Sequence, residues 1–214
     1  ETIGEAAGAN GVTVRLKVAY AAGSSPGPES MIIKLPATAP TVKQVAIRQQ
    51  FYQNEIHFYD DFANRLAVNL PRRYYSGMDE ETGLFALLLE DMAPAVTGDD
   101  FTGCTYDEAI LVVSEIAKLH APWWNSPELD MIAWLPTGEP NVDVAHARFN
   151  ESVLPGVMNN YGHTFSPVVN AVIEAYCKNF SSVVDMISAA PYTLTHSDYR
   201  LVNLLIGGTA PSQT

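Results

Sequence analysis

The stretch of the sequence with the clearest chemical potential is LTHSDYRLVNLLIGG, residues 194–208. Three polar residues, His196, Asp198 and Asn203, interrupt a segment that otherwise has the composition of a hydrophobic strand. A buried polar group without a partner is costly, so these residues are expected to serve a purpose. An Asp and an Asn separated by four residues can accept a hydroxyl proton and bind a magnesium ion on nucleotide phosphates. The spacing therefore predicts a phosphoryl-transfer loop.

A second pair of charged residues, Lys34 and Glu55, lies in apolar surroundings. The Lys34 side chain extends from the predicted short strand MIIKLP, and Glu55 lies on a predicted helix face lined with phenylalanines. Taken singly, a Lys that extends to the surface and a carboxylate at the rim of the helix face are the plainer interpretations. Each charge is costly to bury alone, and a strand followed by a packed helix can bring the two together. In kinases such a pair orients the Lys onto nucleotide phosphates.

The elements that must position these residues follow from hydrophobic periodicity and capping signals. Thr41 with Gln44, and Thr105 with Glu108, have the spacing of a capping box, which predicts two helix starts. In the second of these helices, the face that includes Val113 should be the packed one. Strands are expected at residues 12–18, 31–36 and 83–92, and helices are expected from residue 41, at 105–120 and at 167–188. The inward face of the last helix should carry Val168, Val172, Tyr176, Phe180 and Val183.

Composition excludes several classes of protein. The chain has 214 residues, with 12 basic against 24 acidic residues and a formal charge of −12, and it lacks a basic run for nucleic acid. Cys104 and Cys177 form no CxxC pair, which argues against a disulfide framework or a zinc cluster. The longest apolar run, LFALLL, is far shorter than the roughly 20 residues of a membrane helix, and residues 1–20 lack a signal-peptide pattern. We therefore expect a cytoplasmic protein with no nucleic-acid or membrane partner.

The motifs together resemble the aminoglycoside phosphotransferase and choline kinase-like superfamily, including its ecdysteroid kinase-like relatives. GEAAGANG resembles the glycine loop, MIIKLP the lysine strand, FYQNEIHFYDDF the glutamate helix and LLLEDM the strand that leads into the hinge. AKLHAPWW resembles the end of the first large-lobe helix, and HSDYRLVNLLI resembles the catalytic loop. Their order along the chain is the family's order.

The resemblance implies an α+β, protein kinase-like fold with two lobes. The small N-terminal lobe, residues 1–91, would contain an antiparallel sheet and bind the nucleotide. Residues 92–214 would form part of a mostly helical C-terminal catalytic lobe that is truncated.

The implied activity is transfer of phosphate from ATP or GTP, with Mg²⁺, to a hydroxyl group of a small-molecule substrate. By resemblance, Lys34 would hold the α- and β-phosphates and Glu55 would orient it. Asp198 would be the catalytic base and Asn203 a metal ligand, while His196 would brace the loop.

The resemblance also implies a binding site for the purine. Main-chain groups of Glu90, Asp91 and Met92 would meet the base, with Ile3 and Val14 packing on it. Arg200 is read as a solvent-facing or substrate-adjacent cation. The resemblance does not identify the acceptor substrate.

Three departures from the family pattern bear on activity. Ser197 stands where the family commonly has Gly, and Val202 stands where many bacterial members have Asp. The metal-binding Asp expected on the strand after the catalytic loop is also missing, because Asp198 is the last acidic residue of the chain. We favour a truncated kinase over a degenerate one. Either should show weak or no activity, and exposed C-lobe surface should promote self-association.

Other classes of protein remain as alternatives to a kinase. The main one is a non-catalytic nucleotide-binding or interaction module, a pseudokinase. An iron oxygenase could use His196 and Asp198, but it requires a second His, and none follows His196. A serine hydrolase is disfavoured because the sequence has no G-x-S-x-G motif.

Overall fold

The computed structural model describes residues 10–79, 81–135, 153–187 and 191–207. The chain divides into two compact units. One, which we call the sheet unit, comprises residues 1–122 and 194–214. The other, the helical unit, comprises residues 123–193. All the site residues proposed from the sequence belong to the sheet unit.

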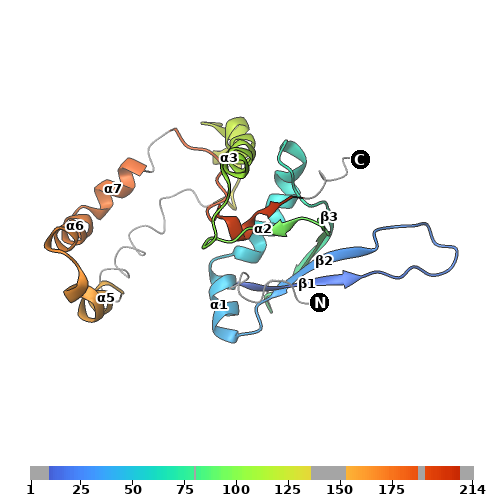
Figure 1. Cartoon of the computed structure of the whole chain (residues 1–214), viewed down its shortest axis with the longest axis horizontal. Coiled ribbons are helices and arrows are strands. Elements are labelled where there is room, and N and C mark those ends of the chain that lie inside the picture. The colour runs from blue at the N-terminus through green and yellow to red at the C-terminus, as the bar shows by residue number, and fades with distance from the viewer. Residues whose placement is uncertain (1–9, 80, 136–152, 188–190, 208–214) are drawn as a thin grey trace. The chain divides into compact units, whose positions relative to one another are not determined.

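The sheet unit is built on four antiparallel strands (Figure 1). Their spatial order is β1-β2-β4-β3. Three of them lie where the apolar patterns predicted strands, whereas β3 was not predicted. The strands are β1 (Gly11–Lys17), β2 (Ser30–Pro36), β3 (Arg73–Asp79) and β4 (Leu84–Glu90). The predicted α+β class with an antiparallel sheet is confirmed.

Helices α1 (Pro40–Arg48) and α2 (Phe51–Asp61) pack on one face of this sheet. The two helices are separated at Gln50, whose φ of 57° lies in the left-handed region. Helix α1 begins at Pro40 without a side-chain cap, so the capping box expected at Thr41 was wrong. A Pro at the first position already supplies the backbone angle that a helix start requires.

The core of the sheet unit lies between β4 and these helices. Alternate residues of β4, Phe85, Leu87 and Leu89, are buried against the helices, as the period of a strand requires. Tyr52 of α2 stacks on Phe85 with 4.4 Å between ring centroids. Its hydroxyl donates to the Asn10 carbonyl at 2.6 Å and accepts from the Ala37 amide at 3.0 Å, so this one side chain joins the core to the start of β1 and to the residue after β2.

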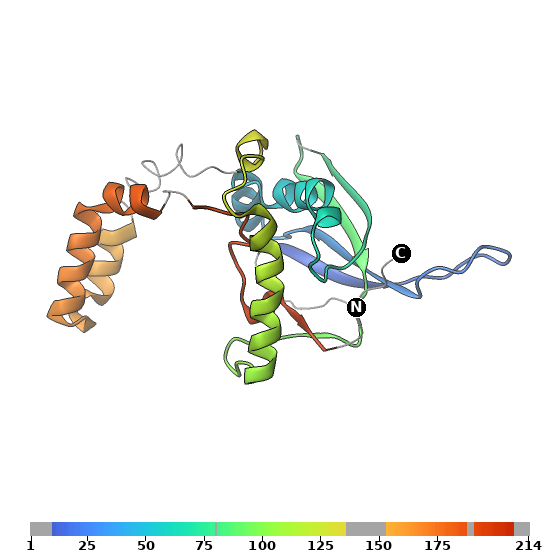
Figure 2. The ribbon, with the colours of Figure 1, turned by 90° about the horizontal axis from the view of Figure 1, so that it is seen from above.

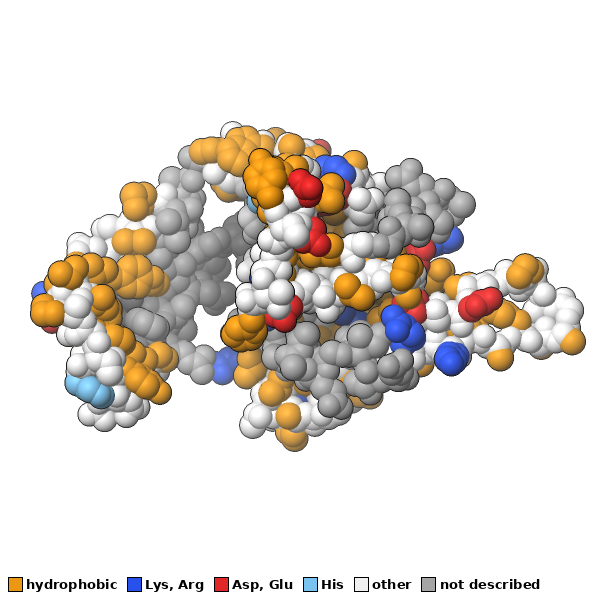
Figure 3. Space-filling model, in the orientation of Figure 1, with side chains coloured by type: hydrophobic (Ala, Val, Ile, Leu, Met, Phe, Trp, Pro, Cys, Tyr) orange, Lys and Arg blue, Asp and Glu red, His pale blue; other side chains and the backbone are white. Residues whose placement is uncertain are grey.

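Helix α3 (Tyr106–His120) begins at the predicted capping box, which is confirmed. The Thr105 hydroxyl accepts from the Glu108 amide at 3.3 Å, and the Glu108 carboxylate accepts from the Thr105 amide at 2.7 Å. The expected covered face was partly wrong, because Val113 is exposed and Leu119 is the buried residue. Hydrophobic side chains gather over α3 on the face shown in Figure 3.

The segment that resembles the catalytic loop returns to the sheet unit and runs along α3 (Figure 2). It contains the short 3-10 helix η6 (Leu201–Asn203) and the two-residue strand β6 (Leu205–Ile206). Strand β6 pairs in antiparallel fashion with β5 (Val96–Thr97). The loop is therefore anchored to a part of the chain that lies a few residues after β4.

Gly98 fixes the contact between β5 and this loop. Its amide donates to the carbonyls of Leu201 at 3.1 Å and Leu204 at 3.2 Å. A Cβ atom on Gly98 would lie 2.9 Å from both the Cβ and the carbonyl oxygen of Leu201. Only glycine allows the two backbones to approach this closely.

In the helical unit, the helix expected at residues 167–188 is two helices, α6 (Pro167–Lys178) and α7 (Phe180–Ile187). They are separated at Asn179, whose side-chain amide donates to the Ala175 carbonyl at 2.8 Å and so competes with a continuous helix. Val168, Val172 and Tyr176 are exposed among the described residues, so their expected inward position was wrong. The other elements of this unit are the 3-10 turn η3 (Leu129–Met131), helix α5 (Leu154–Tyr161) and the turn η5 (Gly162–Thr164). The 3-10 turn η2 (Ala121–Trp123) contains the point in the chain where the sheet unit ends and the helical unit begins.

Across the described ranges of the chain, no helix has both the length and the apolar character needed to cross a membrane.

Candidate active site

Lys34 and Glu55 form an ion pair between β2 and α2. In the strand register Lys34 lies opposite Leu87, so both side chains leave the sheet on the face that α2 covers. Glu55 lies between Tyr52 and Tyr59, the two buried residues of α2, and is thereby held against this face. The pair is only half-buried, with the side chains 37% and 32% exposed, so a ligand can reach it.

Asp198 and Asn203 are joined by two hydrogen bonds within the loop. The Asn203 amide nitrogen donates at 2.8 Å to both the main-chain oxygen and a carboxylate oxygen, Oδ2, of Asp198. The turn η6 makes this possible, because it folds the chain back within five residues. Asp198 remains open to solvent, with 64% of its side chain exposed.

Ser197 adopts a φ of 65° immediately before Asp198. This left-handed conformation costs a residue with a Cβ atom about 1–2 kcal/mol. Glycine avoids this cost. This is a physical reason for the Gly that is common at this position in the family that the chain resembles. Ser197 occupies the position despite the cost.

Arg200 bridges two carboxylates beside the loop. Its Nε atom lies 3.2 Å from Asp198 Oδ1, and its Nη1 atom lies 3.2 Å from Asp100 Oδ2. The sequence interpretation of Arg200 as a solvent-facing or substrate-adjacent cation did not foresee this arrangement. Its position two residues after Asp198 was the available signal, whereas nothing in the sequence pointed to Asp100.

His196 packs within the loop and is influenced by charges from two parts of the site. Its ring meets Tyr199 edge-on at 5.6 Å, and the Tyr199 hydroxyl donates to the Val112 carbonyl of α3 at 2.8 Å. Partial burial lowers the pKa of His196, and Lys34 adds to this effect, whereas Asp198 and Glu55 oppose it. The pKa of this one loop residue is thus affected by Asp198 and, to a smaller degree, by Lys34 and Glu55.

The segment after β4 is held by Asp91. The guanidinium of Arg15 donates to both carboxylate oxygens, Nε to Oδ2 at 2.6 Å and Nη2 to Oδ1 at 3.1 Å. The Asp91 side chain is only 4% exposed. From the sequence, Asp91 was expected to contribute only main-chain groups, and its contact with Arg15 was not predicted.

Two main-chain groups of this segment are already used within the protein. The Glu90 amide donates to the Arg72 carbonyl at 2.8 Å, and the Met92 carbonyl accepts from the Ala95 amide at 2.9 Å. Contacts between the main chain and a purine are therefore expected from other groups, such as the amides of Asp91 and Met92.

The strand register does not bring Val14 to the Lys34 side of the sheet. Val14 lies opposite Ile33 and Thr13 lies opposite Lys34, so Val14 points to the other face. We therefore withdraw Val14 as a purine contact. Ile3 and most of the expected glycine loop lie outside the described residues.

The residues present fit a magnesium ion that is shared with nucleotide phosphates. The amide nitrogen of Asn203 is engaged by Asp198, which leaves the amide oxygen as the atom for a cation. Within the described ranges, no cluster of three or more His, Cys, Asp or Glu residues could hold a metal ion by itself. Mg²⁺ commonly binds through one or two carboxylates plus phosphate oxygens and water, so a site with Asn203 as its protein ligand would take most of its ligands from the nucleotide and from water.

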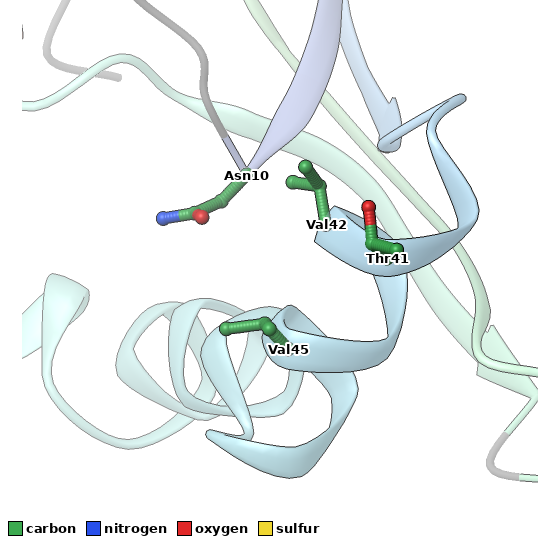
Figure 4. Close-up of a pocket in the computed structure, with 4 residues that line it drawn as sticks. All are labelled: Asn10, Thr41, Val42 and Val45. Atoms are coloured by element: carbon green, nitrogen blue, oxygen red, sulfur yellow. The ribbon is translucent and has the colours of Figure 1, made fainter. Parts of the chain in front are cut away.

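The hollow shown in Figure 4 is separate from these residues. It has a volume of about 280 Å³ and is lined by Asn10 at the start of β1 and by Thr41, Val42 and Val45 of α1. Among the described residues that line it, none is charged and none is a proposed site residue. We assign it no role in the chemistry.

Comparison with models of protein families identifies the family of the chain. The family model described as ecdysteroid kinase-like matches residues 7–122, which is more than half of the chain. The chain belongs to the ecdysteroid kinase-like family. The resemblance inferred from the motifs is thus confirmed, and membership implies a kinase-like phosphotransferase at the level of the family.

The ecdysteroid kinase-like match includes Lys34, Glu55 and the segment after β4, whereas Asp198 and Asn203 lie beyond it. No curated protein and no solved structure matches the chain.

Proposed function

We propose that this ecdysteroid kinase-like chain transfers the terminal phosphoryl group of ATP or GTP to a hydroxyl group of a small molecule, with Mg²⁺. The observation that carries the proposal is that one compact unit holds both the Lys34–Glu55 ion pair and the Asp198–Asn203 pair. His196, in the loop, is influenced by charges from both pairs. Phosphoryl transfer depends mainly on positioning and charge stabilisation, which such an arrangement supplies.

Each residue has a defined role in the proposed reaction. Lys34, oriented by Glu55, binds the phosphates and offsets their negative charge. Asp198 accepts the proton of the acceptor hydroxyl as the new oxygen–phosphorus bond forms. The bond between the terminal phosphorus and the bridging oxygen breaks, and the proton passes from Asp198 to solvent. Asn203 keeps the Asp198 carboxylate in place through its hydrogen bond.

The metal requires no change to this arrangement. Asn203 would hold Mg²⁺ through its amide oxygen, together with phosphate oxygens of the nucleotide. When bound, the ion neutralises charge on the phosphates and orients them.

Nucleotide binding tests the first half of the proposal. Isothermal titration calorimetry with ATP and with GTP, each with and without Mg²⁺, should show Mg²⁺-dependent binding by the wild type. Lys34→Ala should weaken it at least about tenfold, a loss of about 1.4 kcal/mol. Lys118→Ala is the matched control, because Lys118 also pairs with a glutamate, Glu115, but on α3. A folded wild-type protein that binds no nucleotide contradicts the proposal.

Turnover separates the enzyme from the second candidate function, a nucleotide-binding module without catalysis. The observation for the module is that both carboxylate oxygens of Asp198 already have partners, Arg200 and Asn203. The wild type should transfer phosphate from the preferred nucleotide to at least one compound in a panel of sugars, amino alcohols, choline, aminoglycosides and steroid alcohols. Binding without transfer to any of them favours the module.

Self-association and cytoplasmic location are further parts of the proposal. Tyr106, Ile110, Leu111 and Val113 of α3 are exposed and form the surface on which self-association is expected. Sedimentation at increasing concentration should show oligomers that Ile110→Lys reduces. A wild type that remains monomeric at all concentrations argues against this part alone.

A further inference from the structure

Arg15 lies on the same face of the sheet as Lys34. The register pairs Thr13 with Lys34 and Arg15 with Ile32, and side chains directly opposite each other in an antiparallel pair share a face. Arg15 is two residues beyond Thr13, which is about 7 Å along the strand. Its partner Asp91 belongs to the segment after β4. The Arg15 side chain thus spans the face of the sheet from β1 towards the segment proposed to meet the purine.

The contact with Asp91 fixes the plane of the guanidinium. Two hydrogen bonds to the two carboxylate oxygens hold it in a single orientation, in the geometry that suits this pair best. Asp91 Oδ1 also accepts from the Ala93 amide at 3.2 Å, so the carboxylate is itself fixed to the chain. Burial raises the pKa of Asp91, but hydrogen bonds from Arg15, Ser30 and Ala93 outweigh this and lower it, so the carboxylate stays ionised.

The two partners differ in their exposure. The Asp91 side chain is 4% exposed, whereas the Arg15 side chain is 33% exposed. The carboxylate is thus enclosed while part of the Arg15 side chain remains accessible. A flat, fixed cation of this kind is well suited to stack on an aromatic ring.

We propose that Arg15 forms one wall of the base-binding site and presents the flat face of its guanidinium to the purine of the bound nucleotide. The proposal rests on the proposed function, because it assumes that the phosphates lie at Lys34 and the base towards Met92. In this proposal Arg15 makes the purine contact that was expected of Val14, because Val14 faces the other side of the sheet. Asp91 acts as the positioning residue that fixes Arg15.

The test compares ligands with and without a base. Calorimetry would measure the Kd of ATP and of inorganic tripolyphosphate, each with Mg²⁺, on the wild type and on two variants. Arg15→Lys keeps the charge beside Asp91 but loses the plane and the paired donors. The double variant Arg15→Leu/Asp91→Asn removes the guanidinium without leaving an ionised carboxylate unpaired. Arg73→Lys is the control, because Arg73 also pairs with an aspartate, Asp60, in the same unit.

We expect ATP affinity to fall about tenfold in both Arg15 variants, while tripolyphosphate affinity stays within about twofold of the wild type. The control should change neither. A purely structural role would lower the midpoint of urea unfolding without changing the ratio of the two affinities. An unchanged ratio in either folded variant therefore overturns the inference. If the double variant does not fold, Arg15→Lys decides alone.

The wild type distinguishes this inference from the proposed function. If it binds ATP no better than tripolyphosphate, the base contributes nothing to the affinity and the inference about Arg15 is overturned. Phosphate binding at Lys34 would still stand. If it binds neither ligand, both the proposed function and the inference fail.

Discussion

The Lys34–Glu55 pair and the Asp198 loop hold their charged groups in different ways. Lys34 and Glu55 extend from a strand and a helix whose apolar residues pack into one core. Asp198 lies in a loop whose described contacts are mainly hydrogen bonds, ion pairs and a two-residue strand pairing. The first region is positioned by burial and the second by polar contacts with solvent close by.

This difference predicts different responses to mutation. Burial is non-directional and is shared among many side chains, so losing core atoms weakens the whole unit. A hydrogen-bonded loop depends on a few directional contacts, each with a modest net effect on stability. Changes in the loop should therefore affect chemistry more than folding, and changes in the core should affect folding first.

The largest effect on chemistry is expected from Asp198→Asn. Removing the proposed base should lower kcat about 10²- to 10⁴-fold, because this is the usual contribution of general base catalysis. Nucleotide affinity and the urea midpoint should remain close to the wild type, since Asp198 is exposed. Steady-state kinetics and calorimetry check these outcomes. A variant with unchanged kcat would remove Asp198 from the proposed mechanism.

The largest effect on folding is expected from Leu87→Ala. Leu87 is fully buried and lies opposite Lys34, so its truncation should lower the free energy of unfolding by about 3 kcal/mol. Urea denaturation followed by circular dichroism measures the loss. The matched control in the loop region is Leu205→Ala, where the side chain is half exposed and the loss should stay below about 1 kcal/mol. Equal losses in the two variants would contradict the contrast between the regions.

Relief of backbone strain should have a smaller, stabilising effect. Ser197→Gly removes the cost of a left-handed residue and should raise the free energy of unfolding by up to about 1 kcal/mol. Gln50→Gly provides the same test between α1 and α2, because Gln50 also has a positive φ. Thermal melting of both variants compares strain in the two regions. A lower melting temperature for Ser197→Gly would show that the serine side chain has a role of its own in the loop.

The smallest effect concerns pH and His196. The pKa of His196 is lower in the folded chain than its ordinary value of about 6.5, so the unfolded chain binds the proton more readily. The contribution of His196 to stability is therefore present above that value and is lost as pH falls through the folded pKa. The free energy of unfolding of the wild type and of His196→Gln would be measured by urea denaturation at pH 8 and at pH 5. On going from pH 8 to pH 5, the wild type should lose more stability than His196→Gln. A difference that is the same at both pH values contradicts this.

Much of the sheet unit could be predicted because its signals are local. The apolar runs of β1, β2 and β4 and the capping box at Thr105 depend on residues close together in the sequence. Strand β3 was missed because it pairs only with β4 among the described strands and carries polar residues and a glycine. Which face of α3 is covered could not be decided, because apolar residues occur around the whole helix and periodicity does not identify the packed side.

The proposed site residues were found by motif spacing, but their partners were not. Asp198 and Asn203 are close in sequence, so spacing alone indicated that they could act together. Arg15 and Asp91 are 76 positions apart, and only the strand register brings them together. The same register removed Val14 from the site, because a shift of one residue in a strand reverses the face of the sheet.

The close approach of Gly98 to Leu201 has a consequence for genetic studies of this protein. A methyl group at position 98 would press on the backbone of the loop, although Gly98 is remote from that loop in sequence. Gly98→Ala is therefore expected to behave as a conditional allele, tolerated in the cold and inactive when heat loosens the pairing of β5 with β6. An alanine scan would score Gly98 as an active-site residue, although it contributes no side chain to the site.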